Sequence, residues 1–408
     1  MKLTQSKWYP WILVVSYSLL GVGFPAAVTQ FSMAVPDMAR QLGVSRQTVL
    51  LADSLRAVCL VCALFLSGYA YRRLGLRKTM VLGLVFQIAP QFLLPAAVEG
   101  RSLVLFFMFK GTQGLNAVGF PLYIVALTMW TKSRYTALNA AIFNGSFVAG
   151  SGIGAWLSGY LIPRYGWRTS FYAVGAFCLV FAVPAILLTR DREGERPLEN
   201  ASGGSRKGVY GSIIRRPVTW LLVGALLANT WVSQAVTVDM SVYAESMGYT
   251  YSETGKLMLL ISVITVLSSI LAGGISDYAA SRAGDRIQTR CRILILGYIL
   301  SMASSFALPF WAELGFLPLA LASCTMMFGV SWAAGVFWAL PKEIYSGGEQ
   351  VAGTAFCSGA SNIPNPIAPM VVGVLLGTNG FWGAGWFTCG FVSLISALSA
   401  AYINRNKY

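Results

Sequence analysis

The sequence predicts an all-α membrane protein built from two bundles of six helices. Of its 408 residues, 56% are hydrophobic and 11% are charged, and the mean hydropathy is +0.63, whereas soluble domains carry about 25% charged residues. Twelve apolar segments approach the length of about 20 residues that a helix needs to cross a bilayer, and one long polar stretch divides them six and six. Little sequence remains for a large catalytic or binding domain outside the membrane.

The twelve segments follow one another at short intervals. The first has a basic flank but no small-residue cleavage site after it, so we expect it to be a retained helix rather than a signal peptide. The segments cover residues 10–35, 48–71, 77–98, 103–130, 137–162, 169–189, 218–240, 255–276, 291–311, 315–340, 352–376 and 382–403.

The polar stretch, residues 190–217, mixes both signs of charge with glycine and serine, which is typical of a flexible linker. The predicted organisation is an N-terminal bundle over 1–189, a cytoplasmic linker over 190–217 and a C-terminal bundle over 218–408. The sequence of the first half is weakly similar to that of the second. Trp167 and Trp382, one in each half, are separated by the same number of residues as Ala137 and Ala352. Such internal symmetry is typical of secondary transporters.

The formal net charge of +15, from 30 basic and 15 acidic residues, has its explanation in the membrane. Most of the Lys and Arg residues fall in alternate loops, which the positive-inside rule places in the cytoplasm. We therefore expect a multi-pass protein of the cytoplasmic (inner) membrane with both termini inside, a monomer in contact with lipid and not with nucleic acid. The chain has no histidine, and we interpret its cysteines as apolar residues, so no metal or cofactor is expected.

Lys110 lies well inside the fourth apolar segment, where a charge is expensive and marks a functional site by default. Gly111, Gly114 and Gly119 follow it, and small residues let neighbouring helices approach closely. We expect Lys110 to face a water-filled cavity with no carboxylate nearby to neutralise it. The alternative is a hydrogen bond from Lys110 to a backbone carbonyl that supports helix packing.

Arg56 is the other cation that lies well inside a segment and could line the cavity, and it has two interpretations. It could contact a ligand, or it could form an ion pair with Asp53, which lies three residues earlier on the same helix face. The eleventh segment carries Pro364, Pro366 and Pro369, so its helix is predicted to be kinked or broken near the centre. The break would serve as a hinge, or its half-helix N-terminus would meet an anion.

The loop GYAYRRLGLRK, residues 68–78, resembles the signature loop of the major facilitator superfamily, Gly-x-x-x-Asp-Arg-x-Gly-Arg-Arg/Lys. The matching residues are Gly68, Arg73, Gly75 and Arg77. Arg72 stands where the family has Asp and Leu76 where it usually has Arg, so one partner is missing from the charge interaction thought to lock helices two and eleven. The second half keeps Gly273 and Asp277 at the Gly-x-x-x-Asp spacing. A glycine here permits close packing and the basic cluster anchors a tight turn, so we expect a structural, conformational-switch role.

Lys110 to Gly114 is similar to a fourth-helix pattern of the same family, Arg-x-x-Gln-Gly, with Lys in place of Arg. The resemblance implies the major facilitator fold, in which two pseudo-symmetric halves rock around a central cavity lined by helices 1, 4, 7 and 10. The polar residues of this chain that we assign to substrate binding on that basis are Lys110, Arg56, Gln113, Asn144, Gln234, Trp332, Asn362 and Asn365.

A cavity whose charged residues are cationic concentrates anions. The predicted function is therefore secondary transport of a small organic anion, a carboxylate, held by Lys110 and Arg56 through charge-assisted hydrogen bonds. Coupling stays open between proton symport, for which Asp37, Asp53 and Asp239 are weak candidate carriers, and anion exchange. The alternatives are a proton-driven exporter of amphipathic drugs or metabolites and, less favoured, a transporter-like sensor. The sequence shows no set of catalytic residues, so an enzyme is not expected.

Overall fold

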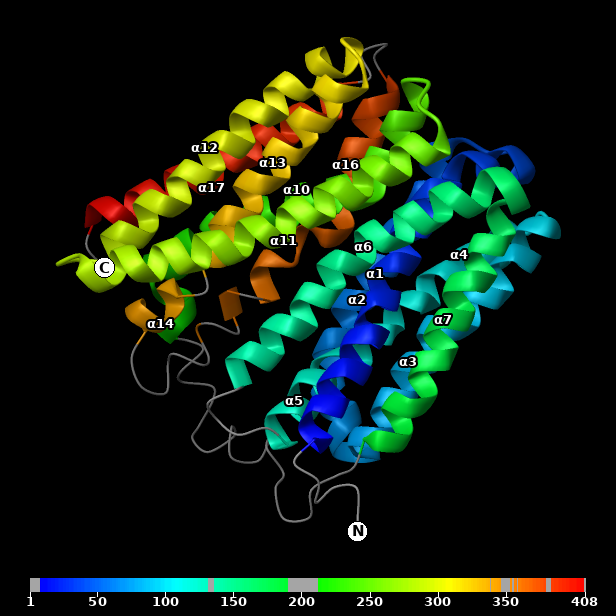
Figure 1. The fold of residues 1–408 in the computed structure, drawn as a ribbon, viewed down its shortest axis with the longest axis horizontal. Coiled ribbons are helices and arrows are strands. Elements are labelled where there is room, and N and C mark those ends of the chain that lie inside the picture. Colours follow the sequence, from blue (N-terminus) through cyan, green and yellow to red (C-terminus); the bar gives the residue numbers. More distant parts are fainter. Residues whose placement is uncertain are drawn as a thin grey trace. The chain divides into compact units, whose positions relative to one another are not determined.

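The computed structural model describes residues 8–130, 136–189, 212–337, 339–345, 353, 356–357, 359–378 and 383–406. All the elements assigned there are helices. Figure 1 shows the helices of the first half lying alongside one another, with α1 in contact with both α6 and α7. These elements are α1 (Tyr9–Leu42), α2 (Arg46–Leu74), α3 (Leu76–Glu99), α4 (Leu103–Gln113), the 3-10 helix η2 (Gly114–Val118), α5 (Phe120–Trp130), α6 (Thr136–Tyr165) and α7 (Trp167–Leu188).

The second half repeats this organisation. Its helix α12 packs against α13 and α17, and α10 packs against α16 and α17. The elements are α10 (Pro217–Ser246), α11 (Tyr251–Arg282), α12 (Arg286–Glu313), α13 (Phe316–Phe337), α14 (Leu340–Ile344), α16 (Pro364–Thr378) and α17 (Ala384–Asn406).

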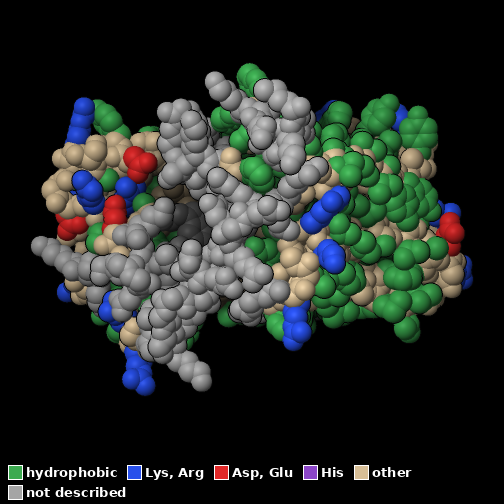
Figure 2. Space-filling model, turned by 90° about the horizontal axis from the view of Figure 1, so that it is seen from below, with side chains coloured by type: hydrophobic (Ala, Val, Ile, Leu, Met, Phe, Trp, Pro, Cys, Tyr) green, Lys and Arg blue, Asp and Glu red, His purple; other side chains and the backbone are tan. Residues whose placement is uncertain are grey.

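The predicted apolar segments correspond to these helices, most of which extend beyond them into polar sequence. In the described part of the chain, ten helices are long and apolar enough to cross a membrane. Large hydrophobic side chains such as Val104, Val180 and Leu317 are exposed on the outside of these helices, and the face drawn in Figure 2 carries wide hydrophobic areas. A surface of this kind suits lipid rather than water, so the chain is a multi-pass membrane protein.

The fourth apolar segment departs from the prediction of one continuous helix. It consists of α4, the 3-10 turn η2 and α5. Gly114, Asn116 and Gly119 have low helix propensity, and Pro121 has no N–H for the carbonyl of Ala117. The chain therefore tightens into a 3-10 helix at this point, directly after Lys110 and Gln113.

The predicted break in the eleventh segment is confirmed. Helical residues 359–361 are followed by a turn at Asn362 and Ile363, and α16 starts at Pro364. Proline is favoured at the first position of a helix because its missing N–H would have no partner there. The proline thus separates the end of one helical piece from the start of the next.

Two compact units make up the chain. Unit 1 comprises residues 1–203 with 250–259, and unit 2 comprises residues 204–249 with 260–408, so the first turns of α11 belong to unit 1. Most of the predicted linker, residues 190–211, lies outside the described residues. The domain boundaries given above stay a prediction.

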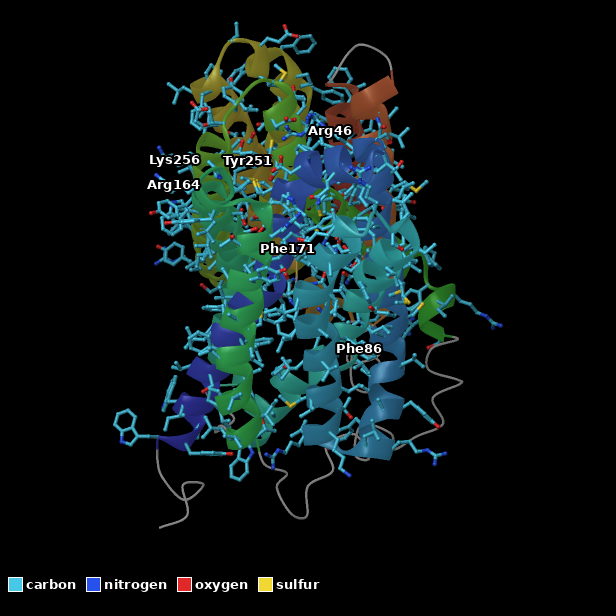
Figure 3. All side chains as sticks on the ribbon, turned by 90° about the vertical axis from the view of Figure 1, so that its right-hand side faces the viewer. Arg46, Phe86, Arg164, Phe171, Tyr251 and Lys256 are labelled. Carbon is cyan, nitrogen blue, oxygen red and sulfur yellow. The ribbon has the colours of Figure 1, made fainter. Side chains whose placement is uncertain are left out.

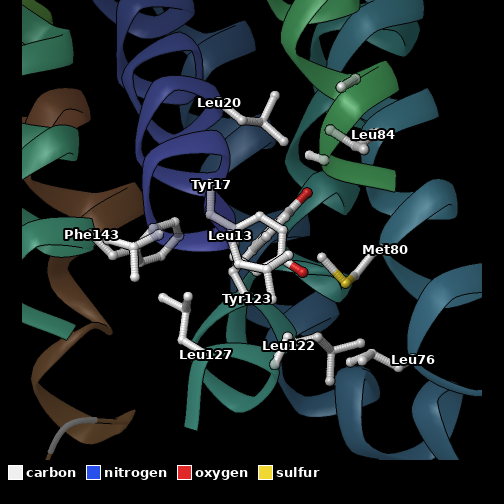
Figure 4. Packing of buried hydrophobic residues seen from close by; sticks show 14 of the residues in the cluster. Leu13, Tyr17, Leu20, Leu76, Met80, Leu84, Leu122, Tyr123, Leu127 and Phe143 are labelled. Carbon is white, nitrogen blue, oxygen red and sulfur yellow. The ribbon is translucent and has the colours of Figure 1, made fainter. Parts of the chain in front are cut away.

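Each unit has its own apolar core. In unit 1, side chains of α1, α3, α5 and α6 meet in the cluster shown in Figure 4, where Tyr17 and Tyr123 pack edge to face at 5.2 Å between ring centroids. In unit 2 the corresponding cluster joins α10, α12, α13 and α17, and the Tyr298 hydroxyl donates a hydrogen bond to the carbonyl of Ala225. These cores fix the helices that carry the polar residues described below.

Candidate functional site: a buried ion cluster in unit 1

Two helices of unit 1 bring three charged side chains together inside the protein. Asp53 and Arg56 of α2 form a two-pronged ion pair, with Arg56 Nε 2.6 Å from Asp53 Oδ1 and Nη2 2.9 Å from Oδ2. Lys110 Nζ of α4 lies 3.1 Å from the same Asp53 Oδ1. Asp53 and Lys110 are each 1% exposed and Arg56 is 6% exposed. We call these three residues the ion cluster.

Lys110 is enclosed on its remaining sides. Its Nζ donates a hydrogen bond to Gln113 Oε1 at 3.2 Å and lies 3.7 Å from the centroid of the Phe31 ring, which α1 supplies. The Phe31 ring stacks in turn on Phe106 of α4, with 6.2 Å between centroids. A cation over an aromatic face gains most when water is excluded, so this pocket of side chains stabilises a buried ammonium.

Two sequence-based expectations for Lys110 are therefore wrong. The side chain is buried and does not face a water-filled cavity in this structure, and a carboxylate does lie against it, although a second cation shares that carboxylate. The carboxylate is that of Asp53, which the sequence suggested only as a partner of Arg56 and as a weak candidate proton carrier. Asp53 follows the start of α2 at Arg46 by seven residues, or about 10 Å along the axis, and it turns inward onto Lys110. For Arg56 the structure shows the ion pair with Asp53, one of its two interpretations.

Caps at the helix starts set the positions of these charges. The hydroxyl of Ser45, the residue before α2, accepts a hydrogen bond from the N–H of Thr48, and the hydroxyl of Ser102, the residue before α4, accepts one from the N–H of Leu105. Side-chain oxygens at this position satisfy N–H groups that the helix leaves free. Lys110 then falls in the last turn of α4, where the partial negative charge of the helix terminus favours a cation.

Glycines bring α2 and α4 close enough for the cluster to form. A Cβ atom at Gly114 would collide with the backbone carbonyl of Arg56, and one at Gly111 would lie 3.0 Å from the side chain of Leu55. At Gly119 a Cβ would lie 3.3 Å from Met80 Cα on α3. The predicted role of these three glycines in close helix packing is confirmed.

The ion cluster carries one excess positive charge, because two cations share one carboxylate. The other acids among the described residues of unit 1 interact elsewhere, at helix ends. Asp37 pairs with Arg40, Glu99 pairs with Arg168, and Glu253 accepts a hydrogen bond from Thr250. An excess charge held in a medium of low dielectric attracts a counter-ion strongly.

One end of unit 1 also includes the first turns of α11. The hydroxyl of Tyr251 donates a hydrogen bond to Asp37 Oδ2 at 2.8 Å, and Gly255 packs against the backbone of Trp156 on α6. Figure 3 shows Arg46, Arg164, Tyr251 and Lys256 in the upper part of the view, toward the same end. Asp37 therefore lies near the C-terminal end of α1, where it contacts the start of α11.

The other residues assigned to substrate binding lie as follows. Gln113 is buried beside Lys110, whereas the side chain of Asn144 lies outside the described residues. In unit 2, Gln234 is partly buried on α10. Asn365 Nδ2 donates to Asn362 Oδ1 at 2.9 Å across the break before α16.

Trp332 of α13 packs against α12. Its Nε1 donates a hydrogen bond to the carbonyl of Ile293 at 3.2 Å, and its ring stacks on Phe328 with 5.5 Å between centroids. These contacts support the packing of two helices. Ligand contact by Trp332, and by the other assigned residues, stays a prediction.

The signature loop of unit 1 is reduced to one residue, because α2 ends at Leu74 and α3 begins at Leu76. Gly75 between them has φ of 80°, a conformation that glycine adopts without strain. Arg73 lies 5.6 Å from the Tyr69 ring, and Arg77 is exposed. Gly68 lies within α2. The predicted tight turn is confirmed.

The equivalent region of unit 2 holds a second ion cluster, at the ends of its helices. Arg290 of α12 binds Asp277 of α11 at 2.9 Å and Glu343 of α14 at 3.0 Å. A Cβ at Gly273 would have 3.8 Å to its nearest neighbour, so close packing in this region depends instead on Gly335, which meets the backbone of Ser269. The sequence-based reasoning found Asp277 but missed Arg290 and Glu343, because neither belongs to the loop pattern.

The polar residues of the described chain do not form a metal site, since no three His, Cys, Asp or Glu side chains lie together there. Phe31 was also missed, because an aromatic residue in an apolar helix gives no signal of its own. The contact of Asp53 with Lys110 could have been considered, since both charges lie inside membrane segments and each is a functional-site hypothesis by default.

Comparison with known proteins identifies the family of this chain. Residues 12–283 match the family model of the Major Facilitator Superfamily. A protein of Agrobacterium vitis named as a tartrate transporter is 24% identical, over 77% of this chain and 72% of its own. One of Escherichia coli K12 named as a galactarate/D-glucarate transporter is 23% identical, over 98% of this chain and 93% of its own. The multidrug resistance protein MdtL of Klebsiella pneumoniae is 24% identical, over 63% of this chain and 65% of its own.

The fold agrees with this assignment. The crystal structure of a D-xylose–proton symporter superimposes with a TM-score of 0.74 at 15% identity, covering 98% of each chain. The family model matches most of the chain, and ten of the described helices are fit to cross a membrane. These findings indicate a transporter rather than an enzyme. The chain belongs to the Major Facilitator Superfamily.

Proposed function

We propose that this protein is a secondary transporter that moves a small organic anion, a carboxylate, across the cytoplasmic membrane by alternating access. The observation that carries the proposal is the charge of the ion cluster, in which Arg56 and Lys110 share the single carboxylate of Asp53. A buried net positive charge favours the entry of an anion and disfavours that of a cation. The relatives named as tartrate and galactarate/D-glucarate transporters support the same substrate class.

Asp53 holds the cations in the absence of substrate. A substrate carboxylate that enters the cluster takes over one or both of them, because Arg and Lys form their strongest hydrogen bonds with carboxylates. Gln113 and Phe31 keep Lys110 oriented toward this position. If either Arg56 or Lys110 is removed, the other cation and Asp53 form a neutral pair. Loss of either cation therefore removes the net charge that attracts the anion.

The first prediction tests this role. We expect Lys110→Gln and Arg56→Gln each to raise the half-saturating anion concentration about 10- to 100-fold, because each removes a charge-assisted hydrogen bond worth about 1.5–3 kcal/mol. The measurement is counterflow of radiolabelled D-glucarate, tartrate or D-gluconate in proteoliposomes. Lys256→Gln, which removes an exposed cation of unit 1, is the matched control and should transport normally. Unchanged affinity in both cluster variants would exclude the cluster from substrate binding.

The second candidate function is proton-driven export of amphipathic drugs or metabolites. The relative named MdtL favours it. A growth-inhibition panel with the gene overexpressed separates the two functions, because an exporter of this kind protects cells against several unrelated toxic compounds. Protection without anion counterflow would replace our first proposal with this one.

We further propose that both chain termini lie in the cytoplasm. The loops that follow the odd-numbered segments are poor in Lys and Arg, whereas the signature loop, the linker and both ends of the chain are rich in them. The anionic inner leaflet and the positive-inside rule favour this orientation. The Asp53 end of α2 then lies toward the outside.

A further inference from the structure

The first turns of α11 cross α6 at a pair of glycines. A Cβ atom at Gly255 would lie 3.3 Å from Gly159 Cα and 2.9 Å from the carbonyl oxygen of Ala155. A Cβ atom at Gly159 would lie 2.5 Å from the carbonyl oxygen of Tyr251. The two backbones therefore meet directly at this crossing, as small residues allow.

A buried hydroxyl group stands next to each of these glycines. Ser158 precedes Gly159 and is 0% exposed, and Thr254 precedes Gly255 and is 2% exposed. Neither hydroxyl has a hydrogen-bond partner among the described residues. Burial of a hydroxyl group without a hydrogen bond is costly, and most buried side-chain oxygens are bonded to protein or to ordered water.

The two hydroxyl groups lie on the same side of the crossing. The helices are antiparallel here, because Ala155 meets Gly255 while Gly159, one turn later, meets Tyr251, one turn earlier. The residue before each glycine is rotated by about 100° around its own helix axis. In two antiparallel helices these rotations turn toward the same side of the contact, so both hydroxyl groups border one groove.

We propose that Ser158 and Thr254 bind a water molecule between α6 and α11, and that this water makes the contact of the two helices easier to separate. The carbonyl oxygens of Ala155 and Tyr251 lie at the same crossing, and a buried water typically makes about three hydrogen bonds. Water suits these groups, because hydroxyls both donate and accept and none of the four groups is charged. The water site goes beyond the proposed function, since it does not depend on the substrate.

The place of the site in the chain connects it with the motion of the protein. Residues 250–259 of α11 belong to unit 1, whereas residues 260–282 belong to unit 2. When the units rock in alternating access, which is part of the proposed function, either α11 bends between these two parts or its first turns separate from α6. Separation of an apolar contact exposes apolar surface to water at a cost, whereas groups that already bind water lose little. The water site therefore favours separation.

Hydroxyl-radical footprinting tests for the water. Radicals formed from a bound water oxidise the side chains beside it, even when these are buried. Met258 follows Thr254 by one turn and is 2% exposed, whereas Met80, in the apolar core of unit 1, is 1% exposed. In the full-length protein in detergent, we expect Met258 to be oxidised several-fold faster than Met80.

Variants identify the residues that hold the water. Ser158→Ala with Thr254→Val removes both hydroxyl groups with little change in volume, and it should abolish the fast oxidation of Met258. Thr254→Ser keeps the hydroxyl group and should behave like the wild type, which separates loss of the hydroxyl from a change in shape. Ser170→Ala is the matched control, because Ser170 is also 0% exposed in unit 1 but donates a hydrogen bond to the carbonyl of Trp167.

Transport kinetics test the role in separation. The same double variant should lower the maximal rate of D-glucarate counterflow several-fold. The half-saturating concentration of D-glucarate should stay the same, because the ion cluster is untouched. Ser170→Ala should change neither quantity.

The possible results are distinct. Oxidation of Met258 no faster than that of Met80 in the wild type, or equally fast oxidation of Met258 in the double variant, overturns the water site. Loss of the fast oxidation with an unchanged maximal rate overturns the role in separation. If the wild-type protein exchanges none of the tested anions, the proposed function and that role fail together, while the oxidation rates still decide the water site.

Discussion

At the scale of single residues, Phe31 and Lys110 show how an apolar helix keeps a cation in its core. The Lys110 ammonium has an ion pair, a hydrogen bond and an aromatic face within 3.7 Å. Removing any one of these from a desolvated charge costs more than the same change at the surface. The hydrophobic neighbours of the ion cluster therefore contribute to its electrostatics.

A double-mutant cycle measures the aromatic contribution. We expect Phe31→Leu and Lys110→Gln to be coupled by about 1–2 kcal/mol in the free energy of unfolding in detergent, because each removes the same cation–π contact. Phe106→Leu is the matched control, since Phe106 stacks on Phe31 and is one contact further from the ammonium. Equal coupling of both phenylalanines to Lys110 would contradict a specific role for the Phe31 ring.

At the scale of elements, the contact of α2 with η2 decides whether the ion cluster can form. Gly114 touches the backbone of α2 at Arg56 and Leu60, so any side chain there pushes the two helices apart. The local sequence from Gly114 to Pro121 is enough to explain why the chain forms a 3-10 turn there. The distance between α2 and η2, in contrast, depends on the side chains of both elements.

We predict that Gly114→Ala destabilises the protein by about 1–3 kcal/mol, the usual cost of overpacking. Gly145→Ala in α6 should be neutral or stabilising, because a Cβ there meets no atom within 4 Å and alanine is a better helix former than glycine. Thermal unfolding of the two purified variants checks this. A similar melting temperature for both would show that α2 and η2 can separate without cost.

At the scale of the whole molecule, the two units place their ion clusters differently. Unit 1 holds its cluster inside the helices, with Asp53 1% exposed. Unit 2 holds Arg290 with Asp277 and Glu343 at helix ends, and the Asp277 side chain is 74% exposed. In unit 2 one cation pairs with two carboxylates, so of the two clusters it is the one in unit 1 that has the excess positive charge on which the proposed function rests.

The orientation of the whole chain is testable with reporter fusions. Alkaline phosphatase, which folds only outside the cytoplasm, should be active when fused after Gly43 or Gly100 and inactive when fused after Gly75 or at the C-terminus. The reason is the excess of Lys and Arg in the loops assigned to the cytoplasm. Activity of the Gly75 fusion together with inactivity of the Gly43 fusion would reverse the proposed orientation.

Features that depend on local physics could be predicted from the sequence alone. Apolar length predicts the membrane segments, the basic cluster of the signature loop predicts the tight turn between α2 and α3, and the three prolines of the eleventh segment predict the break before α16. Gly111 and Gly114 predict close packing, and the spacing of Asp53 and Arg56 predicts their possible pairing. Each depends on residues that are neighbours in the chain or on the composition of one segment, so no knowledge of the fold is needed.

The residues that surround Lys110 depend on how the helices pack. Its contacts with Asp53 and Phe31 join three different helices, and their partners are set by how α1, α2 and α4 rotate and approach one another. A rotation of α2 by one residue moves a side chain by about 100° around the helix axis, which would take Asp53 away from Lys110. The sequence shows that a buried cation exists, whereas the packing of the helices determines that it shares its one carboxylate with a second cation.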